Sequence, residues 1–193
     1  MTEDKEIWIE TPRLIIRSRT LADADDIQSA KEGVWPELQK WMSWAYDSEY
    51  GKDALLRVIQ ESIEKNDPAQ FLIGRCKLSG AFAVSTGIGL NDGRHETGYW
   101  VAKDFLGQGY ATEAANAVIR YAFHAMGVDE MHITYYEDND KSSRIIEKLG
   151  FTKLCTEPKA KARCLDGVLL DVHRYIMTDP SVLPPLDVRW GPP

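Results

Sequence analysis

The strongest structural signal in this chain is the succession Glu96-Thr97-Gly98-Tyr99-Trp100-Val101 and then Phe105-Leu106-Gly107-Gln108-Gly109-Tyr110-Ala111-Thr112. The first stretch is typical of a strand, and the second turns through two glycines into a run with helical periodicity. Glycine lets backbone N–H groups come close to an anion at a helix N-terminus. The sequence therefore predicts a strand, a phosphate-binding corner and a helix in direct succession.

The segment after the corner shows the clearest helical period in the chain, and Gly127 is expected to end this helix. Met131–Tyr136 alternates apolar and polar side chains and is expected to be the next strand. A short helix should then begin at Asn139-Asp140-Lys141-Ser142 and end at Gly150, where a left-handed residue is common. The apolar stripe of the first helix consists of Ala111, Ala114, Ala115, Val118, Ile119, Ala122 and Phe123.

The region before this segment predicts further strands and helices. Thr20 is suited to cap a helix whose first turns carry acidic residues. Gly51–Asn66 places its apolar residues on one helical face. Strands are expected over Arg13–Arg17, Gln70–Cys76, Ala81–Leu90, His95–Val101, Phe151–Cys155 and Val168–Met177, with turns at Lys77–Gly80 and Asn91–Gly93. Together these elements predict an α/β fold with a mixed sheet flanked by helices.

The domain organisation predicted is one domain over residues 7–179 and a proline-rich tail over residues 180–193. The chain of 193 residues is 44% hydrophobic, which allows one sizeable core but leaves no room for a second domain. Prolines at 180, 184, 185, 192 and 193 interrupt backbone hydrogen bonding. The tail is therefore expected to be an extended arm or disordered.

Composition excludes several classes of partner. The formal charge of −7 disfavours nonspecific binding to nucleic acid or to anionic membranes, and it favours cationic substrates. We see neither an uninterrupted apolar run long enough to span a membrane nor a signal peptide, so we expect a cytoplasmic protein. Cys76, Cys155 and Cys164 form no close metal-binding pair, and we expect reduced, mostly structural thiols. The histidines show no metal spacing.

The glycine corner fits two common nucleotide motifs poorly. A dinucleotide-binding motif would have a third glycine where this chain has Thr112, and a nucleoside-triphosphate loop would end in Gly-Lys-Ser or Gly-Lys-Thr. A structural turn without a ligand is the plain alternative. A diphosphate bound by successive N–H groups requires only small residues, and Gly109 and Ala111 supply them.

These segments resemble the GNAT acetyltransferase superfamily, and most closely its Rim-type enzymes, which acetylate protein N-termini. The opening Thr11-Pro12-Arg13-Leu14 with Asp23-Ala24 resembles the Rim-type N-terminus. The resemblance implies a splayed mixed sheet with acetyl-coenzyme A in the cleft. It also implies direct acetyl transfer to an amine. Leu106 departs from the family pattern, which has Gln or Arg there, and this removes a polar contact to the cofactor.

The resemblance implies cofactor contacts along the strand, at the corner and at the second helix. Backbone groups of the strand would pair with the pantetheine arm, and Gly98 would help the local splay. Many related enzymes use a tyrosine just before the Glu-Lys pair, but Ile146 stands there. The cofactor residues so implied are Tyr99, Trp100, Val101, Gly107, Gln108, Gly109, Tyr110, Ala111, Thr112, Asn139 and Ser142.

Two residues are candidates for catalysis. Glu96 shares a strand face with Gly98 and Trp100 and could accept the amine proton, because an ammonium group cannot attack a carbonyl. Alternatively, it is a solvated carboxylate at a strand end. Ser142 matches the serine that assists the departing thiolate in Rim-type enzymes. Alternatively, Asn139 caps the helix and Ser142 is simply a first-turn residue.

An aromatic segment offers a candidate acceptor wall. Trp41 and Trp44 are three residues apart and could share a helical face. In enzymes of this kind the early helices border the acceptor, so these tryptophans are predicted to bind substrate, with core packing as the alternative.

We therefore predict acetyl transfer from acetyl-coenzyme A to a primary amine, such as a peptide N-terminus, without a metal. A polyamine, an aminoglycoside or an amino-acid-derived toxin is the alternative acceptor. A noncatalytic coenzyme A-binding regulatory module is a further alternative, and a homodimer remains open.

Overall fold

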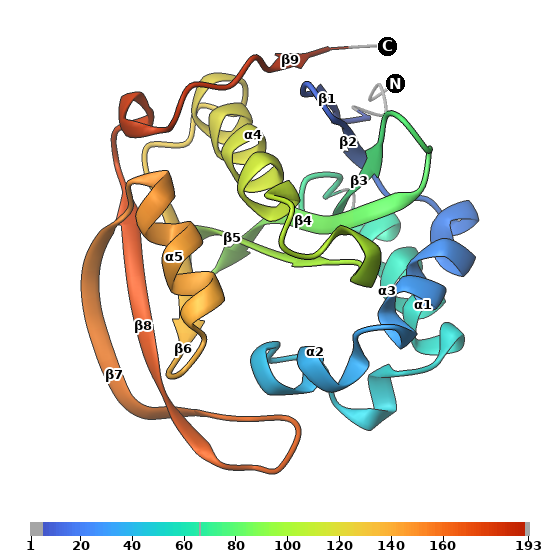
Figure 1. The fold of residues 1–193 in the computed structure, drawn as a ribbon, viewed down its shortest axis with the longest axis vertical. Helices are drawn as coiled ribbons and strands as arrows, with labels where there is room; N and C mark the ends of the chain where they lie inside the picture. Colours follow the sequence, from blue (N-terminus) through green and yellow to red (C-terminus); the bar gives the residue numbers. More distant parts are fainter. Residues whose placement is uncertain (1–5, 66, 192–193) are drawn as a thin grey trace.

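The computed structural model describes residues 6–65 and 67–191, which form a nine-stranded sheet flanked by five helices (Figure 1). The helices are α1 (Ala24–Glu32), α2 (Trp35–Trp41), α3 (Lys52–Glu64), α4 (Tyr110–His124) and α5 (Asp140–Leu149). The strands are β1 (Trp8–Glu10), β2 (Leu14–Ser18), β3 (Leu72–Cys76), β4 (Phe82–Asn91), β5 (Arg94–Val101), β6 (Met131–Tyr136), β7 (Thr152–Ala162), β8 (Leu169–Met177) and β9 (Arg189–Trp190). The predicted α/β fold is confirmed. The helix end expected at Asn66 and the last two prolines, Pro192 and Pro193, lie outside the described residues.

The sheet has the order β7-β8-β6-β5-β4-β3-β2-β1-β9 and is divided near its middle. Every neighbouring pair with a matched register is antiparallel except β5 and β6, which are parallel and match at a single position, Glu96 with His132. Beyond that position the two strands diverge (Figure 1). The sequence predicted this splay through the family resemblance, and the single matched pair confirms it.

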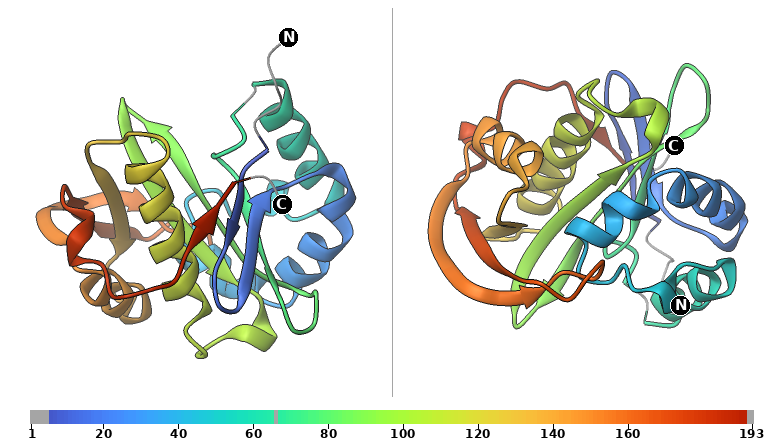
Figure 2. Two further views of the ribbon diagram at one scale, coloured as in Figure 1. Left: turned by 90° about the horizontal axis from the view of Figure 1, so that it is seen from above. Right: turned by 60° about the horizontal axis from the view of Figure 1, so that its bottom comes forward.

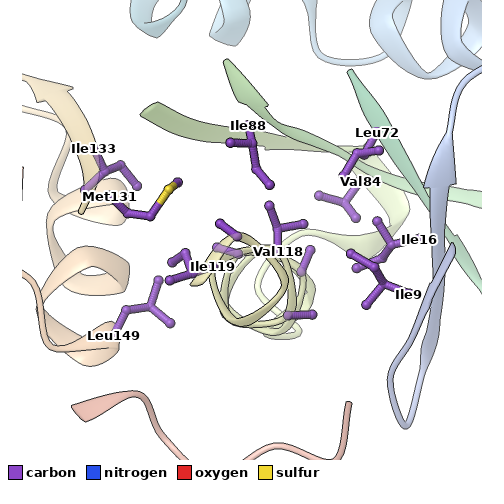
Figure 3. Packing of buried hydrophobic residues seen from close by; sticks show 14 of the residues in the cluster. Ile9, Ile16, Leu72, Val84, Ile88, Val118, Ile119, Met131, Ile133 and Leu149 are labelled. Carbon is purple, nitrogen blue, oxygen red and sulfur yellow. The ribbon is translucent and has the colours of Figure 1, made fainter. Parts of the chain in front are cut away.

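The two faces of the sheet carry different helices. Helices α4 and α5 cover one face, whereas α1 and α3 lie on the other (Figures 1 and 2). The apolar stripe of α4 is buried in the main core, where Val118 and Ile119 contact side chains of several strands (Figure 3). Complete burial of such aliphatic side chains stabilises the fold by about 1.5–3 kcal/mol each. Helix α4 is therefore anchored firmly, and its N-terminus is held in place.

The turn between β4 and β5 explains the register of the strand that carries the candidate site. Asn91 pairs with Arg94, so only two residues form the loop, and both have positive φ angles, 49° for Asp92 and 76° for Gly93. Two-residue hairpin loops favour Asx-Gly because both positions require a left-handed backbone. The predicted Asn91–Gly93 turn is confirmed, and it sets the position of Glu96 opposite Gly89.

The C-terminal tail requires a correction. Its described part, residues 180–191, begins with a 3-10 turn at Pro180–Val182 and then runs extended. It is neither a free arm nor outside the sheet, because Trp190 pairs with Ile9 as part of β9. Leu183 is 4% exposed, and Asn116 donates a hydrogen bond to the Pro184 carbonyl. Proline removes only its own N–H group, so the proline-free stretch at residues 186–191 could still pair with the open edge of β1.

Three further findings concern the described residues. No helix in residues 6–65 and 67–191 is long and apolar enough to cross a membrane. The three cysteines are free thiols. Within the same residues, no group of three or more His, Cys, Asp or Glu side chains could hold a metal ion.

Candidate active site

A cavity of about 600 Å³ occupies the split between β5 and β6 and extends beneath α1 and α3. Residues from both faces of the sheet line this cavity. Tyr99 and Ser142 belong to the α4–α5 side, because Tyr99 packs against the main core. Trp100 belongs to the opposite side, because it packs against residues of α1 and α2. The cavity therefore connects two chemically different faces.

The glycine corner presents a row of unused backbone donors. Gly107 and Gly109 have φ angles of 72° and 83°, a left-handed conformation that glycine adopts readily. No N–H group from Gly107 to Thr112 has a hydrogen-bond partner among the residues that the structure describes. A Cβ at Gly107 would meet nothing within 4 Å. Together with the dipole of α4, this corner fits a diphosphate.

Residues from the start of the chain hold this corner in place. The Arg13 Nε atom donates to Glu113 Oε2 at 2.5 Å, and its Nη1 atom donates to the Gln108 carbonyl at 2.9 Å. Thr11 donates from its hydroxyl to Glu113 Oε1 at 2.6 Å. The sequence analysis did not predict a role for Arg13 or Glu113, because it used Thr11–Leu14 only as a mark of resemblance.

The side chain of Tyr110 points away from the corner. It is 8% exposed, and its hydroxyl lies 3.6 Å from Cys76 Sγ. The Arg13 guanidinium lies 4.2 Å from the centre of its ring. Only the backbone of Tyr110 is therefore available to a ligand at the corner.

The start of α5 places a hydroxyl pair in the cavity. Asn139 caps the helix, since its Oδ1 atom accepts a hydrogen bond from the Ser142 N–H at 3.2 Å. The Ser142 hydroxyl lies 3.1 Å from the Tyr99 hydroxyl. Burial raises the pKa of Tyr99 to about 12, so the phenol stays protonated at neutral pH and can donate to Ser142. Ser142 can in turn donate its own proton into the cavity.

Glu96 lies on the other face of the split, with its side chain 22% exposed. Asn91 Nδ2 donates to its Oε2 atom at 3.0 Å, and Arg174 Nη1 lies 3.7 Å from its Oε1 atom. The surface beside it is bare, because a Cβ at either Gly89 or Gly98 would meet nothing within 4 Å. A small amine could therefore approach this carboxylate along the sheet.

The cavity includes only part of the predicted set. It is lined by Glu96, Tyr99, Trp100, Asn139, Ser142, Trp41 and Trp44. Val101 and the corner residues Gly107–Thr112 are not part of its lining, as far as the described residues define it. A long ligand that reached both the corner and Ser142 would have to run along β5 between them.

The tryptophan pair has a different geometry from the one expected. Helix α2 ends at Trp41, and Met42 is extended, so Trp44 lies outside the helix and the shared helical face is wrong. Both side chains nevertheless line the cavity. The loop between β7 and β8 closes over this region, because the Leu165 N–H donates to the Gln39 carbonyl at 3.1 Å.

Several residues of the candidate site were missed by sequence reasoning. Asn91 was read only as a turn residue, and Arg174 only as part of a strand, yet both contact Glu96. Arg19 and Lys31 line the far end of the cavity, and no local pattern marked them. A basic residue directly after a strand is too common a feature to predict a site.

Comparisons with known proteins agree on one family. The family model described as an acetyltransferase (GNAT) domain matches residues 13–152. YdaF of Bacillus subtilis (strain 168), which carries the provisional name of a ribosomal N-acetyltransferase, is 39% identical over 88 residues. That match covers 46% of this chain and 44% of YdaF, so the chain matches less than half the length of this relative.

Solved structures show the same fold. The ribosomal-protein-S5-alanine acetyltransferase from Vibrio fischeri superposes with a TM-score of 0.79 at 17% identity, covering 92% of this chain and 99% of that one. RimL, a ribosomal L7/L12 alpha-N-protein acetyltransferase in complex with coenzyme A, superposes with a TM-score of 0.77 at 17% identity. That match covers 89% of this chain and 97% of RimL.

Proposed function

Because the chain belongs to the GNAT acetyltransferase family, we propose that it is an N-acetyltransferase that transfers an acetyl group from acetyl-coenzyme A to the N-terminal amine of a peptide or protein. This proposal rests on one observation: Ser142 and Glu96, which come from opposite faces of the split sheet, line the same cavity. One residue can serve the leaving group and the other can serve the attacking amine.

The corner and the split fit acetyl-coenzyme A. The N–H groups of Gly107–Thr112 would hold the diphosphate, and the diverging edge of β5 from Gly98 onward would hold the pantetheine arm. When bound, this cosubstrate supplies the activated acetyl group. Asn139 lies in the cavity wall and would contact the arm near its thiol end.

Ser142 is proposed to assist departure of the thiolate. Its hydroxyl can donate a hydrogen bond to developing negative charge on sulfur. The Tyr99 hydroxyl, 3.1 Å away, can at the same time donate to the Ser142 oxygen and so orient the Ser142 proton towards the sulfur. Tyr99 is thus a positioning residue. The high pKa of Tyr99 suits that role, because the phenol does not ionise at neutral pH.

Glu96 is proposed to accept the proton of the amine, directly or through water. An ammonium group has no lone pair, so a base must remove its proton before it attacks the thioester. Asn91 and Arg174 orient the carboxylate, and the bare surface at Gly89 and Gly98 leaves room for the amine beside it. No acyl-enzyme step is required.

The choice of a peptide acceptor rests on the names of the similar proteins, three of which refer to ribosomal or ribosomal-protein acetyltransferases. The test is acetyl-coenzyme A turnover, measured by thiol release, over a panel of unblocked peptides and small amines. We expect turnover with peptides that have a free N-terminus and none with the same peptides N-terminally blocked. Turnover with polyamines or aminoglycosides alone would overturn the peptide assignment. Tight coenzyme A binding without turnover of any amine would favour a regulatory module.

A further inference from the structure

Arg19 is a half-buried cation that lines the candidate-site cavity and has no anionic partner among the described residues. It directly follows β2, and its guanidinium lies 3.8 Å from the centre of the Phe71 ring. Its Nη2 atom donates to the Val58 carbonyl at 3.2 Å. Its Nε atom is buried without a hydrogen-bond partner, and no described carboxylate lies within 4 Å of its guanidinium.

The fold does not explain why a charge is kept there. Burial lowers the pKa of Arg19 to about 10, so it remains cationic at neutral pH. An unpaired charge that is partly withdrawn from water loses hydration energy. Two neighbouring arginines avoid this cost, since Arg17 and Arg75 both pair with Asp23. Arg19 has donors to spare, because a guanidinium carries five N–H groups.

A second cation, Lys31, also lines this cavity. Lys31 is 3% exposed and donates to the Glu49 carbonyl at 2.7 Å, but its ammonium pairs with no carboxylate among the described residues. The Glu49 carboxylate is instead bound by Arg57. The cavity lining therefore contains Glu96 and Glu49 together with Arg19 and Lys31, and among the described residues no carboxylate lies within 4 Å of either cation.

The strand pairing indicates how far Arg19 lies from the proposed reaction centre. Ser18, Leu72, Thr86 and Tyr99 pair successively across β2, β3, β4 and β5. One residue further along, the Arg19 N–H donates to the Phe71 carbonyl and Gly87 pairs with Gly98, and the backbone of Gln70 lies over Gly87 between them. Because the guanidinium already lies over Phe71, about two strand spacings, roughly 10 Å, separate it from Gly98.

We propose that Arg19 binds an acidic side chain of the acceptor peptide, about three residues from the amine that is acetylated. An extended peptide advances about 3.3 Å per residue, so three residues span this distance. A free amino acid is too short to reach both ends, and a polyamine has the wrong charge for Arg19. This inference rests on the proposed function, because it assumes that the amine lies at Glu96.

The diphosphate of the cofactor is not the anion that Arg19 would bind. The corner that fits it lies at the N-terminus of α4, on the opposite face of the sheet from α3, which contacts Arg19. The Arg19 donors therefore remain free when the cofactor is bound. An arginine that can bind a carboxylate through two parallel hydrogen bonds is well suited to select one acidic group.

The experiment compares two peptides in three proteins. The peptides are Ala-Ala-Glu-Ala amide and Ala-Ala-Gln-Ala amide, which differ only in one charge and lack a C-terminal carboxylate. The proteins are the unmodified chain, Arg19→Met, and the control Arg57→Met, which removes an exposed cation of α3 outside the cavity lining. The first readout is the ratio of kcat/KM for the Glu and Gln peptides, which is independent of the folded fraction. The second is calorimetric binding of the N-acetylated peptides with coenzyme A present.

We expect the unmodified chain and Arg57→Met to prefer the Glu peptide by about 10- to 100-fold, and Arg19→Met to lose this preference. Equal use and equal binding of both peptides by the unmodified chain would overturn the inference, as would an unchanged preference in Arg19→Met. If no peptide is acetylated, the proposed function fails, while the binding readout still decides the role of Arg19. Should Arg19→Met not fold, Arg19→Lys replaces it and is expected to show a reduced preference.

Discussion

The two faces of the split sheet use different means to build one site. The face with α4 and α5 offers backbone N–H groups at Gly107–Thr112 and the hydroxyl of Ser142, all within a short stretch of sequence. The face with α1 and α3 offers side chains that range from Arg19 to Arg174. A cofactor that is the same in every reaction suits a fixed backbone corner, whereas an acceptor is recognised by side chains that can differ between proteins.

This difference implies that substitutions on the two faces should have separable effects. Changes at the corner should alter the affinity for acetyl-coenzyme A whichever amine is used. Changes near Glu96 or Arg19 should alter how the rate depends on the amine. Ser142 lines the cavity that both faces share, and a substitution there should lower turnover without changing the affinity for acetyl-coenzyme A.

The largest effect is expected at the corner. Gly109→Trp should weaken acetyl-coenzyme A binding by about 1,000-fold, because the new side chain covers the N–H groups and displaces several charge-assisted hydrogen bonds. Binding is measured by calorimetry. The matched control is Gly80→Trp, because Gly80 also has a positive φ angle, 73°, but lies in the β3–β4 turn. A Cβ at Gly80 would meet nothing within 4 Å, and one at Gly109 would meet only the flexible end of Arg13, at 3.5 Å.

Both variants share the cost of a tryptophan in a left-handed conformation, so their thermal stabilities should fall alike. Only Gly109→Trp should lose the cofactor. Normal affinity in a folded Gly109→Trp protein would remove the corner from the cofactor site and break the division between the faces.

A smaller effect is expected at Ser142, in the cavity that both faces line. Ser142→Ala should lower kcat by about 100-fold at unchanged acetyl-coenzyme A affinity, because a hydrogen bond to developing charge acts mainly in the transition state. Ser143→Ala is the control, since the Ser143 hydroxyl is directed to Glu147 on the same helix. Equal turnover in the two variants would leave Ser142 with only its first-turn role beside Asn139.

The smallest effect, and the one most dependent on conditions, is expected on the acceptor face. Glu96→Gln should reduce peptide acetylation by about tenfold near pH 6, where few N-terminal amines are unprotonated, and by less as the pH rises past the amine pKa of about 8. The control is Glu157→Gln, which removes the other carboxylate bound by Arg174. It should keep the pH–rate profile of the unmodified protein. A profile of Glu96→Gln that matches that of the unmodified protein at full activity would assign the proton to another residue or to solvent.

Much of the cofactor face could be predicted because its signals are local. The glycines at the corner, the cap at Asn139 and the stripe on α4 each depend on residues within one or two turns of each other, and all three are observed. The alternation on β5 likewise predicted that Glu96 and Trp100 face away from Tyr99. Such patterns follow from the periods of helix and strand, which require no knowledge of distant contacts.

The acceptor face and the tail could be predicted only in part because their contacts are distant in sequence. The spacing of Trp41 and Trp44 suggested a shared helical face, but the helix ends at Trp41, and the cavity wall forms where Trp44 and the β7–β8 loop meet. The prolines suggested an extended or disordered tail, but Trp190 pairs with Ile9 along the edge of β1.

By itself, the sequence determined the family, most of the strands and helices from β2 to β8, and the corner at the N-terminus of α4, because each is encoded by residues close together along the chain. Only the tertiary structure decided that Arg19 lies unpaired in the same cavity as Glu96, that Asn91 and Arg174 orient that carboxylate, and that the tail completes the sheet. These arrangements depend on strand register and on packing between segments far apart in sequence. No local pattern specifies where such distant charges come to lie.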